Sequence, residues 1–433
     1  MKILVRNGIV IDPAQGLECP ADLLIEGGRV RELRMGGGMG GGSTPAVSDL
    51  IVVEARGCLV MPGLVDMHTH LREPGFEYKE TIRTGTLAAV KGGFTSVCCM
   101  PNTNPVNDNV TVTDFILRKT YAEGACYVYP IGAISKGQKG EELAEIGMMH
   151  EAGCVAFSDD GRPVMNSLLM RRALEYARSF DVPLISHSED LHLSDGGVMN
   201  EGRLSTLLGL RGIPAAAEEV MVARDIALAR LTGSRLHIAH VSTKGSVSLI
   251  RRAKAEGIKV TAETCPHYFS MTEDAVAGYV TNAKVNPPLR TAEDVSAIRE
   301  GLQDGTLDVI ATDHAPHHRD EKLLEFDRAP SGISGLETAL SLSLRLVSDG
   351  VLTLPQLVER MSARPAAILG VPKGSLAIGA DADVVIVDPE AAWKVEVGQF
   401  VSLGKNSPFE GWELKGRPVV TICKGRLHDF REK

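Results

Sequence analysis

The chain has 433 residues, of which 44% are hydrophobic, 23% charged and only 4% aromatic, and its formal net charge is −9. This composition is typical of a globular protein of about two or three domains. It excludes a strongly basic surface and an aromatic platform for nucleic acid. We expect neither a membrane span nor a signal peptide. The eight cysteines form no C-x-x-C pair, which favours reduced thiols in a cytoplasmic protein.

Residues 1–56 carry short runs in which apolar and polar residues alternate. These runs are "KILVRNGIVID", "ADLLIEGGRVREL" and "LIVVEAR", and their period of two predicts β-strands joined in hairpins. The glycine-rich stretch "MGGGMGGGS" interrupts them. Residues 35–42 are therefore expected to form a flexible loop. A phosphate-binding loop is disfavoured because no G-K-[ST] sequence follows.

Residues 57–373 change in character, because short apolar runs now alternate with longer helical stretches. The runs are "CLVMPGLVDMH", "TSVCCM", "CYVYPIGA", "CVAFSDD", "VPLISHSE", "RLHIAHVS", "IKVTAETC" and "LDVIATDHA". Stretches such as "SLLMRRALEYARSF" repeat apolar residues at helical spacing. Eight strands separated by helices predict an α/β protein with a (β/α)₈ barrel of the TIM type.

Residues 374–433 return to strand-like runs, "SLAIGADADVVIVDP" and "RPVVTICKGRLH". We expect this tail to pair with the strands of residues 1–56, so that both chain ends build one small β domain beside the barrel. A separate C-terminal domain is the alternative.

Polar side chains follow most of the barrel strands, where such a barrel places its active site. His68 and His70 are two residues apart at the end of the first run, so they project from the same face of the strand. Later strand ends supply Asp159, Asp160, His187, His240 and Asp313. Imidazole and carboxylate groups suit Zn²⁺ or a similar divalent ion.

Six ligands are too many for one tetrahedral ion and sufficient for two. His68, His70 and Asp313 would hold the first ion. His187 and His240 would hold the second, and a carboxylate after the fourth strand would bridge both. Spacing alone does not choose between Asp159 and Asp160 for this bridge.

Four other histidines are expected outside the metal site. His267 follows the seventh strand and fits a supporting role beside the site. His314 is adjacent to Asp313 and should point the opposite way, and His318 should only flank the site. His237 is expected on the outer side of the barrel.

The motifs and their order resemble those of the bacterial type I dihydroorotases, a family of the amidohydrolase superfamily. The matching stretches are "VDMHTHLREPG", "MPNTNP", "FSDDG", "NPPLR" and "ATDHAPH", and the resemblance spans essentially the whole chain. It implies a zinc-dependent cyclic amide hydrolase of pyrimidine biosynthesis. Its reaction would be the reversible cyclisation of N-carbamoyl-L-aspartate to L-dihydroorotate.

The resemblance also implies a role for each matching residue. The implied metal ligands are His68, His70, Asp160, His187, His240 and Asp313, for one or two zinc ions, with two expected. Asp313 would additionally shuttle a proton while the metals activate water to hydroxide. The implied substrate contacts are Arg72, Asn102, Asn286 and His317. Where the family often has a Phe-Gly pair, this sequence has "APSGISG", so that Ser331 and Gly332 would use backbone groups.

Arg72 has a physical rationale of its own. It lies two residues after His70, so it should reach the same mouth of the barrel, and its guanidinium fork fits a carboxylate in two places.

Two alternatives remain at this point. A hydantoinase or allantoinase would share the fold and the metals, but this chain lacks the fourth-strand lysine of many amidohydrolases and carries the Arg72–Asn102 pair. A non-catalytic subunit supporting aspartate transcarbamoylase is disfavoured because all six ligand positions are filled. The expected partner is the small-molecule substrate, and a homodimer or an association with the transcarbamoylase is compatible with the sequence.

Overall fold

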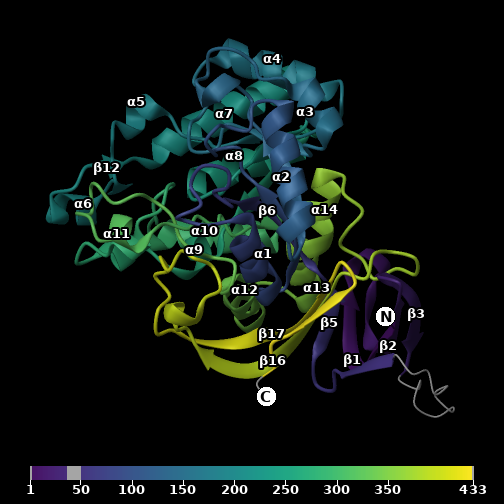
Figure 1. Ribbon diagram of the computed structural model, residues 1–433. Helices are drawn as coiled ribbons and strands as arrows, with labels where there is room; N and C mark the ends of the chain where they lie inside the picture. Colours follow the sequence, from purple (N-terminus) through teal and green to yellow (C-terminus); the bar gives the residue numbers. More distant parts are fainter. Residues whose placement is uncertain (1, 37–49, 432–433) are drawn as a thin grey trace.

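A parallel β-barrel and a flanking sheet make up the computed structural model, which describes residues 2–36 and 50–431 (Figure 1). The predicted fold class is confirmed. The glycine-rich loop predicted for residues 35–42 lies outside the described residues from position 37 onward.

The eight predicted barrel runs all form strands that pair in parallel in chain order. These strands are β6 (Leu64–Thr69), β7 (Phe94–Cys99), β8 (Tyr127–Gly132), β9 (Ala156–Ser158), β10 (Leu184–Ser186), β13 (Leu236–Ile238), β14 (Val260–Thr264) and β15 (Val309–Ile310). Their inward residues pack an apolar core that includes Met67, Ile185 and Val309. The carboxyl ends of all eight strands therefore lie at one rim, as in other barrels of this type.

One helix after each strand covers the outside of the barrel (Figure 1). These helices are α1 (Ile82–Lys91), α2 (Val110–Glu123), α3 (Ile146–Ala152), α4 (Ser167–Arg178), α7 (Ala215–Thr232), α8 (Lys244–Ala255), α10 (Ala292–Gln303) and α12 (Ala339–Ser348). In α4 the buried residues Leu169, Ala173 and Ala177 repeat every four positions, which places them on the face toward the strands. Asn166 begins this helix by accepting hydrogen bonds from two backbone N–H groups.

Shorter elements extend from the strand ends and surround the rim. They are α5 (Leu191–Ser194), β11 (Met199–Asn200), α6 (Arg203–Leu208), β12 (Gly212–Ile213), α9 (Pro266–Ser270) and α11 (Arg319–Lys322). After α12, the chain passes through α13 (Leu354–Val358), a π-helical turn (Glu359–Ala363) and α14 (Arg364–Leu369) before it leaves the barrel.

The first and last barrel strands meet at a seam, which we define as the contact between Asp66 to His70 and Thr312 to His314. The Asp66 carboxylate accepts hydrogen bonds from the backbone N–H of Thr312 at 3.1 Å and from its hydroxyl at 2.6 Å. The backbone N–H of His70 donates to the carbonyl of His314 at 2.8 Å. This seam closes the barrel and brings two ligand-bearing strand ends together.

The flanking sheet joins both ends of the chain. Its strands are β1 (Lys2–Asp12), β2 (Leu17–Glu26), β3 (Arg29–Met35), β4 (Leu50–Glu54), β5 (Leu59–Pro62), β16 (Val384–Lys394), β17 (Glu413–Cys423) and β18 (Arg426–Asp429). The order is β18-β17-β16-β5-β1-β2-β3, with β4 paired to β1. Because β16 pairs antiparallel with β5, the tail belongs to the N-terminal sheet, and the alternative of a separate C-terminal domain is wrong.

The run "CLVMPGLVDMH", which we expected to form one barrel strand, forms two strands. Leu59–Pro62 joins the flanking sheet and Leu64–Thr69 joins the barrel. Gly63 separates them at a close approach, where an added Cβ would lie 2.2 Å from the hydroxyl of Thr95. The run therefore carries the chain directly from one sheet into the other.

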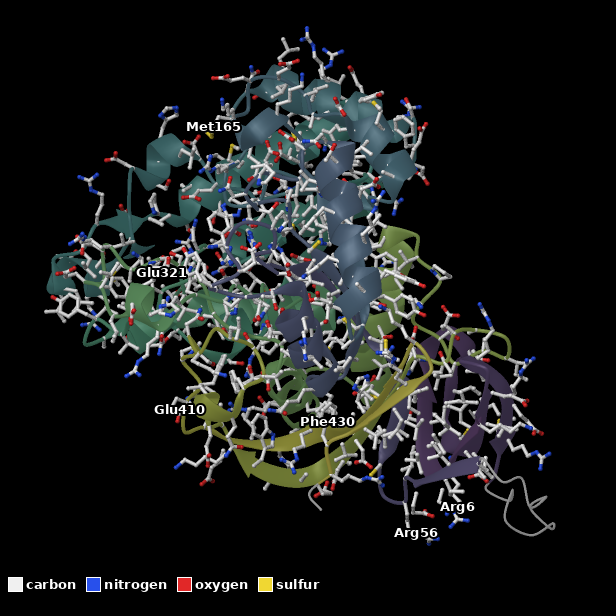
Figure 2. The ribbon with its side chains drawn as sticks, viewed as in Figure 1. Arg6, Arg56, Met165, Glu321, Glu410 and Phe430 are labelled. Carbon is white, nitrogen blue, oxygen red and sulfur yellow. The ribbon has the colours of Figure 1, made fainter. Side chains whose placement is uncertain are left out.

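Arg6 of β1 and Arg56, in the turn between β4 and β5, lie at the end of the molecule away from the barrel (Figure 2). All eight cysteines are free. In the described part of the chain, no helix has the length and apolar character needed to cross a membrane.

Candidate active site

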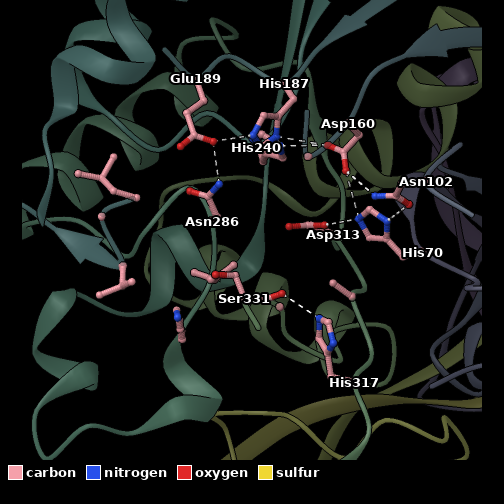
Figure 3. A pocket seen from close by; sticks show the side chains of 18 of the residues that line it. His70, Asn102, Asp160, His187, Glu189, His240, Asn286, Asp313, His317 and Ser331 are labelled. Carbon is pink, nitrogen blue, oxygen red and sulfur yellow. Dashed lines mark hydrogen bonds and ion pairs between the residues drawn. The ribbon is translucent and has the colours of Figure 1, made fainter. Parts of the chain in front are cut away.

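The carboxyl ends of the barrel strands surround a cavity of about 330 Å³ (Figure 3). This volume is typical of small-molecule sites. Apart from His68, every predicted ligand and substrate contact lines the cavity. His68 is fully buried and touches the cavity wall through Asp160 and Asp313.

His68 and His70 turn the same ring nitrogen toward two carboxylates. The Nε2 atom of His68 lies 3.3 Å from Asp160 Oδ1 and 3.5 Å from Asp313 Oδ1. The Nε2 atom of His70 lies 3.1 Å from Asp313 Oδ1 and 3.5 Å from Asp160 Oδ2. The end of β6 thus supplies two imidazoles and the end of β15 supplies one carboxylate to a common point.

His187 and His240 approach Asp160 from the other side. His187 follows β10, and its Nδ1 lies 3.4 Å from Asp160 Oδ1. His240 follows β13, and its Nε2 lies 3.5 Å from the same oxygen. Asp160 therefore stands between two groups of potential ligands, and the ligand atoms of each group lie within 4.8 Å of one another.

The residues present fit one or two divalent ions. His68 Nε2 and Asp160 Oδ1 are buried and have no hydrogen-bond partner among the described residues, which is costly unless a cation lies between them. Burial lowers the pKa of His68, but the carboxylates of Asp160, Glu263 and Asp313 outweigh it and hold the pKa well above its ordinary value. The cluster therefore attracts positive charge, and its nitrogen and oxygen donors suit zinc.

The structure distinguishes Asp159 from Asp160, which spacing alone did not. Asp159 Oδ1 accepts hydrogen bonds from the backbone N–H groups of Ile134 and Ser135 at 2.8 and 3.1 Å, and its other oxygen accepts from the Ser135 hydroxyl. Burial raises the pKa of Asp159 to about 6. Asp159 holds the loop after β8, whereas Asp160 lies in the cluster.

His237 is not where we expected it. The expectation of an outward-facing side chain is wrong: His237 is fully buried, and its Nε2 lies 3.3 Å from Glu263 Oε2 inside the barrel. On β13 the neighbouring Leu236 and Ile238 pack in the core beneath the helices, so His237 takes the inner face.

The other three histidines lie outside the metal cluster, as expected. His314 contacts Glu80 at 3.3 Å and the backbone N–H of Gly335 at 3.2 Å. His318 caps the start of α11. His267 is buried beside Tyr268, and burial lowers its pKa to about 4.

Arg72 projects into the cavity beside His317. Its Nε donates to the carbonyl of Pro316 at 3.2 Å, and one terminal nitrogen lies 3.3 Å from His317 Nε2. On the other side of the His317 ring, Lys79 Nζ lies 3.3 Å from Nδ1. Burial and these two cations lower the pKa of His317, so its imidazole is neutral. This part of the cavity carries the positive charge that an anion requires.

Three cavity residues have a backbone conformation that side chains rarely adopt. Their φ angles are +63° at Arg72, +33° at His240 and +46° at Asp313. Such strain persists where the surrounding fold enforces it and is common at functional sites.

Asn102 contacts two of the predicted metal ligands, whereas Asn286 contacts Glu189, which is not one of them. Asn102 Oδ1 accepts from His70 Nδ1 at 2.9 Å, and its amide nitrogen lies 3.5 Å from Asp160. Asn286 donates to Glu189 at 2.9 Å on the opposite wall (Figure 3). Both side chains face the cavity, as the sequence predicted.

Ser331 and Gly332 line the cavity in the loop after β15. The Ser331 carbonyl accepts from His317 Nε2 at 2.9 Å. Gly332 donates its N–H to the Lys284 carbonyl at 2.9 Å, and its own carbonyl accepts from Asn406 at 2.9 Å. Gly332 thus has its backbone groups engaged within the protein, as has the Ser331 carbonyl, and the substrate contacts expected of both residues stay predictions.

Two carboxylates beside the cluster were missed in the sequence. Glu189 Oε2 lies 3.1 Å from His187 Nε2, and Glu263 Oε1 lies 2.6 Å from His68 Nδ1. Glu189 has the same two-residue spacing from His187 that joins His68 to His70, and this signal could have revealed it. Glu263 had no comparable signal, because its partner is on another strand.

Comparisons with known proteins give relatives that match the chain along almost its whole length. The family model described as "Dihydro-orotase-like" matches residues 57–246. A dihydroorotase of Geobacter metallireducens is 58% identical over 427 residues, covering 99% of both chains. One from Geobacter sulfurreducens is 59% identical over the same length, with the same coverage.

A similar solved structure is the L-hydantoinase (dihydropyrimidinase) from Arthrobacter aurescens, with a TM-score of 0.87 and 26% identity. The match covers 100% of this chain and 96% of the hydantoinase chain. Full-length identity above one half, together with the converging histidines and aspartates, identifies the family: the chain belongs to the dihydroorotases, which are cyclic amide hydrolases.

Proposed function

We propose that this protein is a type I dihydroorotase that interconverts N-carbamoyl-L-aspartate and L-dihydroorotate in pyrimidine biosynthesis, with two zinc ions at its active site. The observation that carries the proposal is the convergence of four histidines around Asp160 in the cavity that also contains Arg72. Such a site joins metal-ligating groups to a fork for a carboxylate.

The first zinc position is assigned to His68, His70 and Asp313, and the second to His187 and His240. Asp160 is assigned as the bridge, since its two oxygens face different histidines at 3.3 to 3.5 Å. Divalent ions bound there would supply Lewis-acid polarisation of the amide carbonyl and lower the pKa of water.

Asp313 is assigned the proton transfer. In the hydrolytic direction, the ring C–N bond breaks as a water oxygen bonds to the carbonyl carbon. The Asp313 carboxylate takes a proton from that water and delivers it to the leaving nitrogen. Ring closure reverses these transfers. The surroundings of Asp313 support this assignment. Its Oδ1 lies 3.1 Å from His70 Nε2, and the residue lines the cavity.

The cavity also supports recognition of a dicarboxylate substrate. Arg72 offers the fork for the carboxylate that is not consumed, and Asn102, which contacts His70, lines the same cavity. Asn286, His317 and Ser331 are assigned to the ring and ureido groups, because they line the remaining wall.

A comparison of turnover among related cyclic amides, with zinc content measured in parallel, tests the proposed function. Purified protein should turn over dihydroorotate and carbamoyl-aspartate, with hydantoin and allantoin converted far more slowly, and zinc content measured in the same sample should approach two per chain. Faster turnover of hydantoin or allantoin would overturn the substrate assignment. Zinc-free protein without turnover, alone or with the transcarbamoylase, would favour the non-catalytic alternative.

We place this reaction in the cytoplasm, which the eight free cysteines support. The homodimer and the association with aspartate transcarbamoylase stay predictions. Analytical sedimentation of the protein, with and without the transcarbamoylase, measures both.

A further inference from the structure

A line of polar residues runs from the metal cluster into the barrel interior. His68 Nε2 faces Asp160 at the cluster, while its Nδ1 lies 2.6 Å from Glu263 Oε1. The second oxygen of Glu263 lies 3.3 Å from His237 Nε2, and His237 Nδ1 lies 2.8 Å from the Thr261 hydroxyl. Glu263 and His237 are both fully buried.

We propose that Glu263, braced by His237, is a positioning residue for the metal ligand His68. The carboxylate holds the His68 proton on Nδ1 and so directs the Nε2 lone pair toward the first metal position. This inference rests on the metal site of the proposed function.

The physical argument begins with the two tautomers of a neutral imidazole. Either ring nitrogen can carry the proton, and only the other can bind a metal. An ionised carboxylate can only accept a hydrogen bond, so a contact of 2.6 Å fixes the proton of His68 on Nδ1. Carboxylates placed behind metal-bound histidines in this way orient the ring and strengthen its donor atom.

Among the described residues, the Glu263 carboxylate has polar contacts with His68 and His237 alone. Apolar side chains such as Met67 and Ile185 fill the barrel interior, and a carboxylate buried among them is costly unless it is hydrogen-bonded. Its two oxygens face two imidazoles, one in the cluster and one beneath it. The fold thus holds the carboxylate rigidly, because Glu263 and His237 lie on the adjacent strands β14 and β13.

The other histidine ligands differ in the group that contacts the ring nitrogen turned away from the metal position. This difference makes the proposal specific to His68. His187 has a carboxylate behind it too, Glu189, but this one lies in the cavity wall and also binds Asn286. His70 has the neutral amide of Asn102 instead. Among the described residues His240 Nδ1 has no partner. Loss of Glu263 should therefore weaken the first position and spare the second.

The experiment compares four variants with the wild type. Glu263→Gln keeps the size and one acceptor oxygen but removes the charge, and Glu263→Leu removes both. Glu189→Gln is the mirror variant at the second position. Asp308→Asn is the stability control, because Asp308 is a buried carboxylate at the opposite end of the barrel that binds Lys254 and Arg364.

The readout without metal is the ¹⁵N shift of His68 in zinc-free protein with labelled histidine, recorded at a pH above the raised pKa of this ring, where the neutral imidazole reports the tautomer. We expect the Nδ1–H form in the wild type and in Glu263→Gln, and a mixture in Glu263→Leu. Asp308→Asn should leave the His68 signal unchanged even where it lowers the melting temperature.

The readouts with metal are zinc affinity, by competition with a chelator, and anomalous diffraction at limiting zinc, which separates the two positions. Glu263→Gln and Glu263→Leu should weaken the first position by about 10- to 100-fold, the usual effect of losing such a partner. Glu189→Gln should weaken the second. Wild-type affinity at the first position together with an unchanged His68 tautomer in Glu263→Leu would overturn the proposal.

The controls separate this inference from the proposed function. If the wild type itself bound no zinc, the metal site and not the role of Glu263 would fail. If Glu263→Leu did not fold, Glu263→Gln would still decide the matter through its zinc affinity, because it preserves the volume and an acceptor oxygen.

Discussion

Asp159 and Asp160 are adjacent in the chain, yet the bend after β9 turns their side chains toward different partners. Asp159 accepts hydrogen bonds from Ile134 and Ser135 in the loop after β8. Asp160 instead lies among the four histidines, with one oxygen that has no hydrogen-bond partner among the described residues. One carboxylate therefore holds a loop and the other holds the cluster.

This pair offers a matched comparison. We expect Asp160→Asn to lose zinc at both positions, because an amide supplies no negative charge to bridge two cations. Asp159→Asn should lower the melting temperature but keep both ions, since it disturbs only hydrogen bonds to the loop. Zinc content by atomic absorption measures both, and equal metal loss in the two variants would contradict the assignment.

Arg72 allows a test of substrate recognition. Arg72→Met should raise KM for dihydroorotate by about 10- to 100-fold, the value of a lost charge-assisted hydrogen bond. Zinc content should not change, because Arg72 contacts Pro316 and His317 rather than the metal ligands. The KM of Arg72→Lys should lie between those of the wild type and Arg72→Met, because lysine keeps the charge but lacks the guanidinium fork. Wild-type KM in Arg72→Met would exclude this role.

Asp313 allows a test of proton transfer. Asp313→Asn should reduce kcat by about 10²- to 10⁴-fold, because the amide cannot take a proton from water. Steady-state kinetics with zinc-saturated enzyme give kcat, and metal analysis of the same sample shows how much of the loss comes from the ligand. A fully active, zinc-loaded Asp313→Asn would rule out the proton shuttle.

At the residue scale, strand periodicity and spacing placed the four histidines and Asp313 at strand ends, where the structure has them around one cluster. Spacing did not choose between Asp159 and Asp160, and only the family resemblance favoured Asp160. The same reasoning failed for His237 and missed Glu263. Their contacts cross from β13 to β14, and the register that aligns His237 with Thr261 is set by tertiary pairing. Asn102 was expected at the cavity, but its bond with His70 could not be foreseen from either position alone.

Among the elements, the loop after β15 is held in part by two buried lysines, Lys284 and Lys322. Lys322, the last residue of α11, donates to the carbonyls of Pro330 at 2.8 Å and Gly332 at 3.3 Å. Lys284 donates to the carbonyl of Phe326 at 2.7 Å. Burial first, and then the nearby Lys284 charge, lower the pKa of Lys322 to about 7.

This lowered pKa gives stability a dependence on pH with a definite sign. Between about pH 7 and the ordinary lysine pKa of 10.5, the unfolded chain binds more protons at Lys322 than the folded one. The unfolding free energy of the wild type should therefore rise with pH in this window relative to Lys322→Met, by at most about 1.4 kcal/mol per pH unit.

Urea unfolding of wild type and Lys322→Met at several pH values between 7 and 10 measures the difference. Groups that titrate in both proteins cancel in the comparison. A constant difference across this range would show that Lys322 keeps an ordinary pKa.

At the element scale, sequence reasoning found all eight barrel strands, since each buried parallel strand reads as an apolar run. It did not find the division at Gly63, because "CLVMPGLVDMH" is apolar on both sides of it. Two short buried strands have the same hydrophobic pattern in the sequence as one longer strand. The two cases can be distinguished only by the strands with which each segment pairs.

For the whole molecule, metal binding should add to stability, because the ligands come from widely separated strands. Zinc that binds only the folded chain stabilises it by about 4 kcal/mol when its concentration is a thousand times the dissociation constant. Removing zinc with a chelator should therefore lower the melting temperature by several degrees, and adding zinc back should restore it. Calorimetry measures the shift, and identical curves would contradict a structural contribution from the ion.

The seam also constrains when the first metal position can form during synthesis of the chain. Asp66 and Thr312 are 246 positions apart, and the donors of the first metal position straddle the same junction. No nascent chain on the ribosome can complete that position until its final barrel strand has emerged and docked. Ion capture at this position would therefore be a late step of maturation, and occupancy would mark molecules whose ring of strands has already closed.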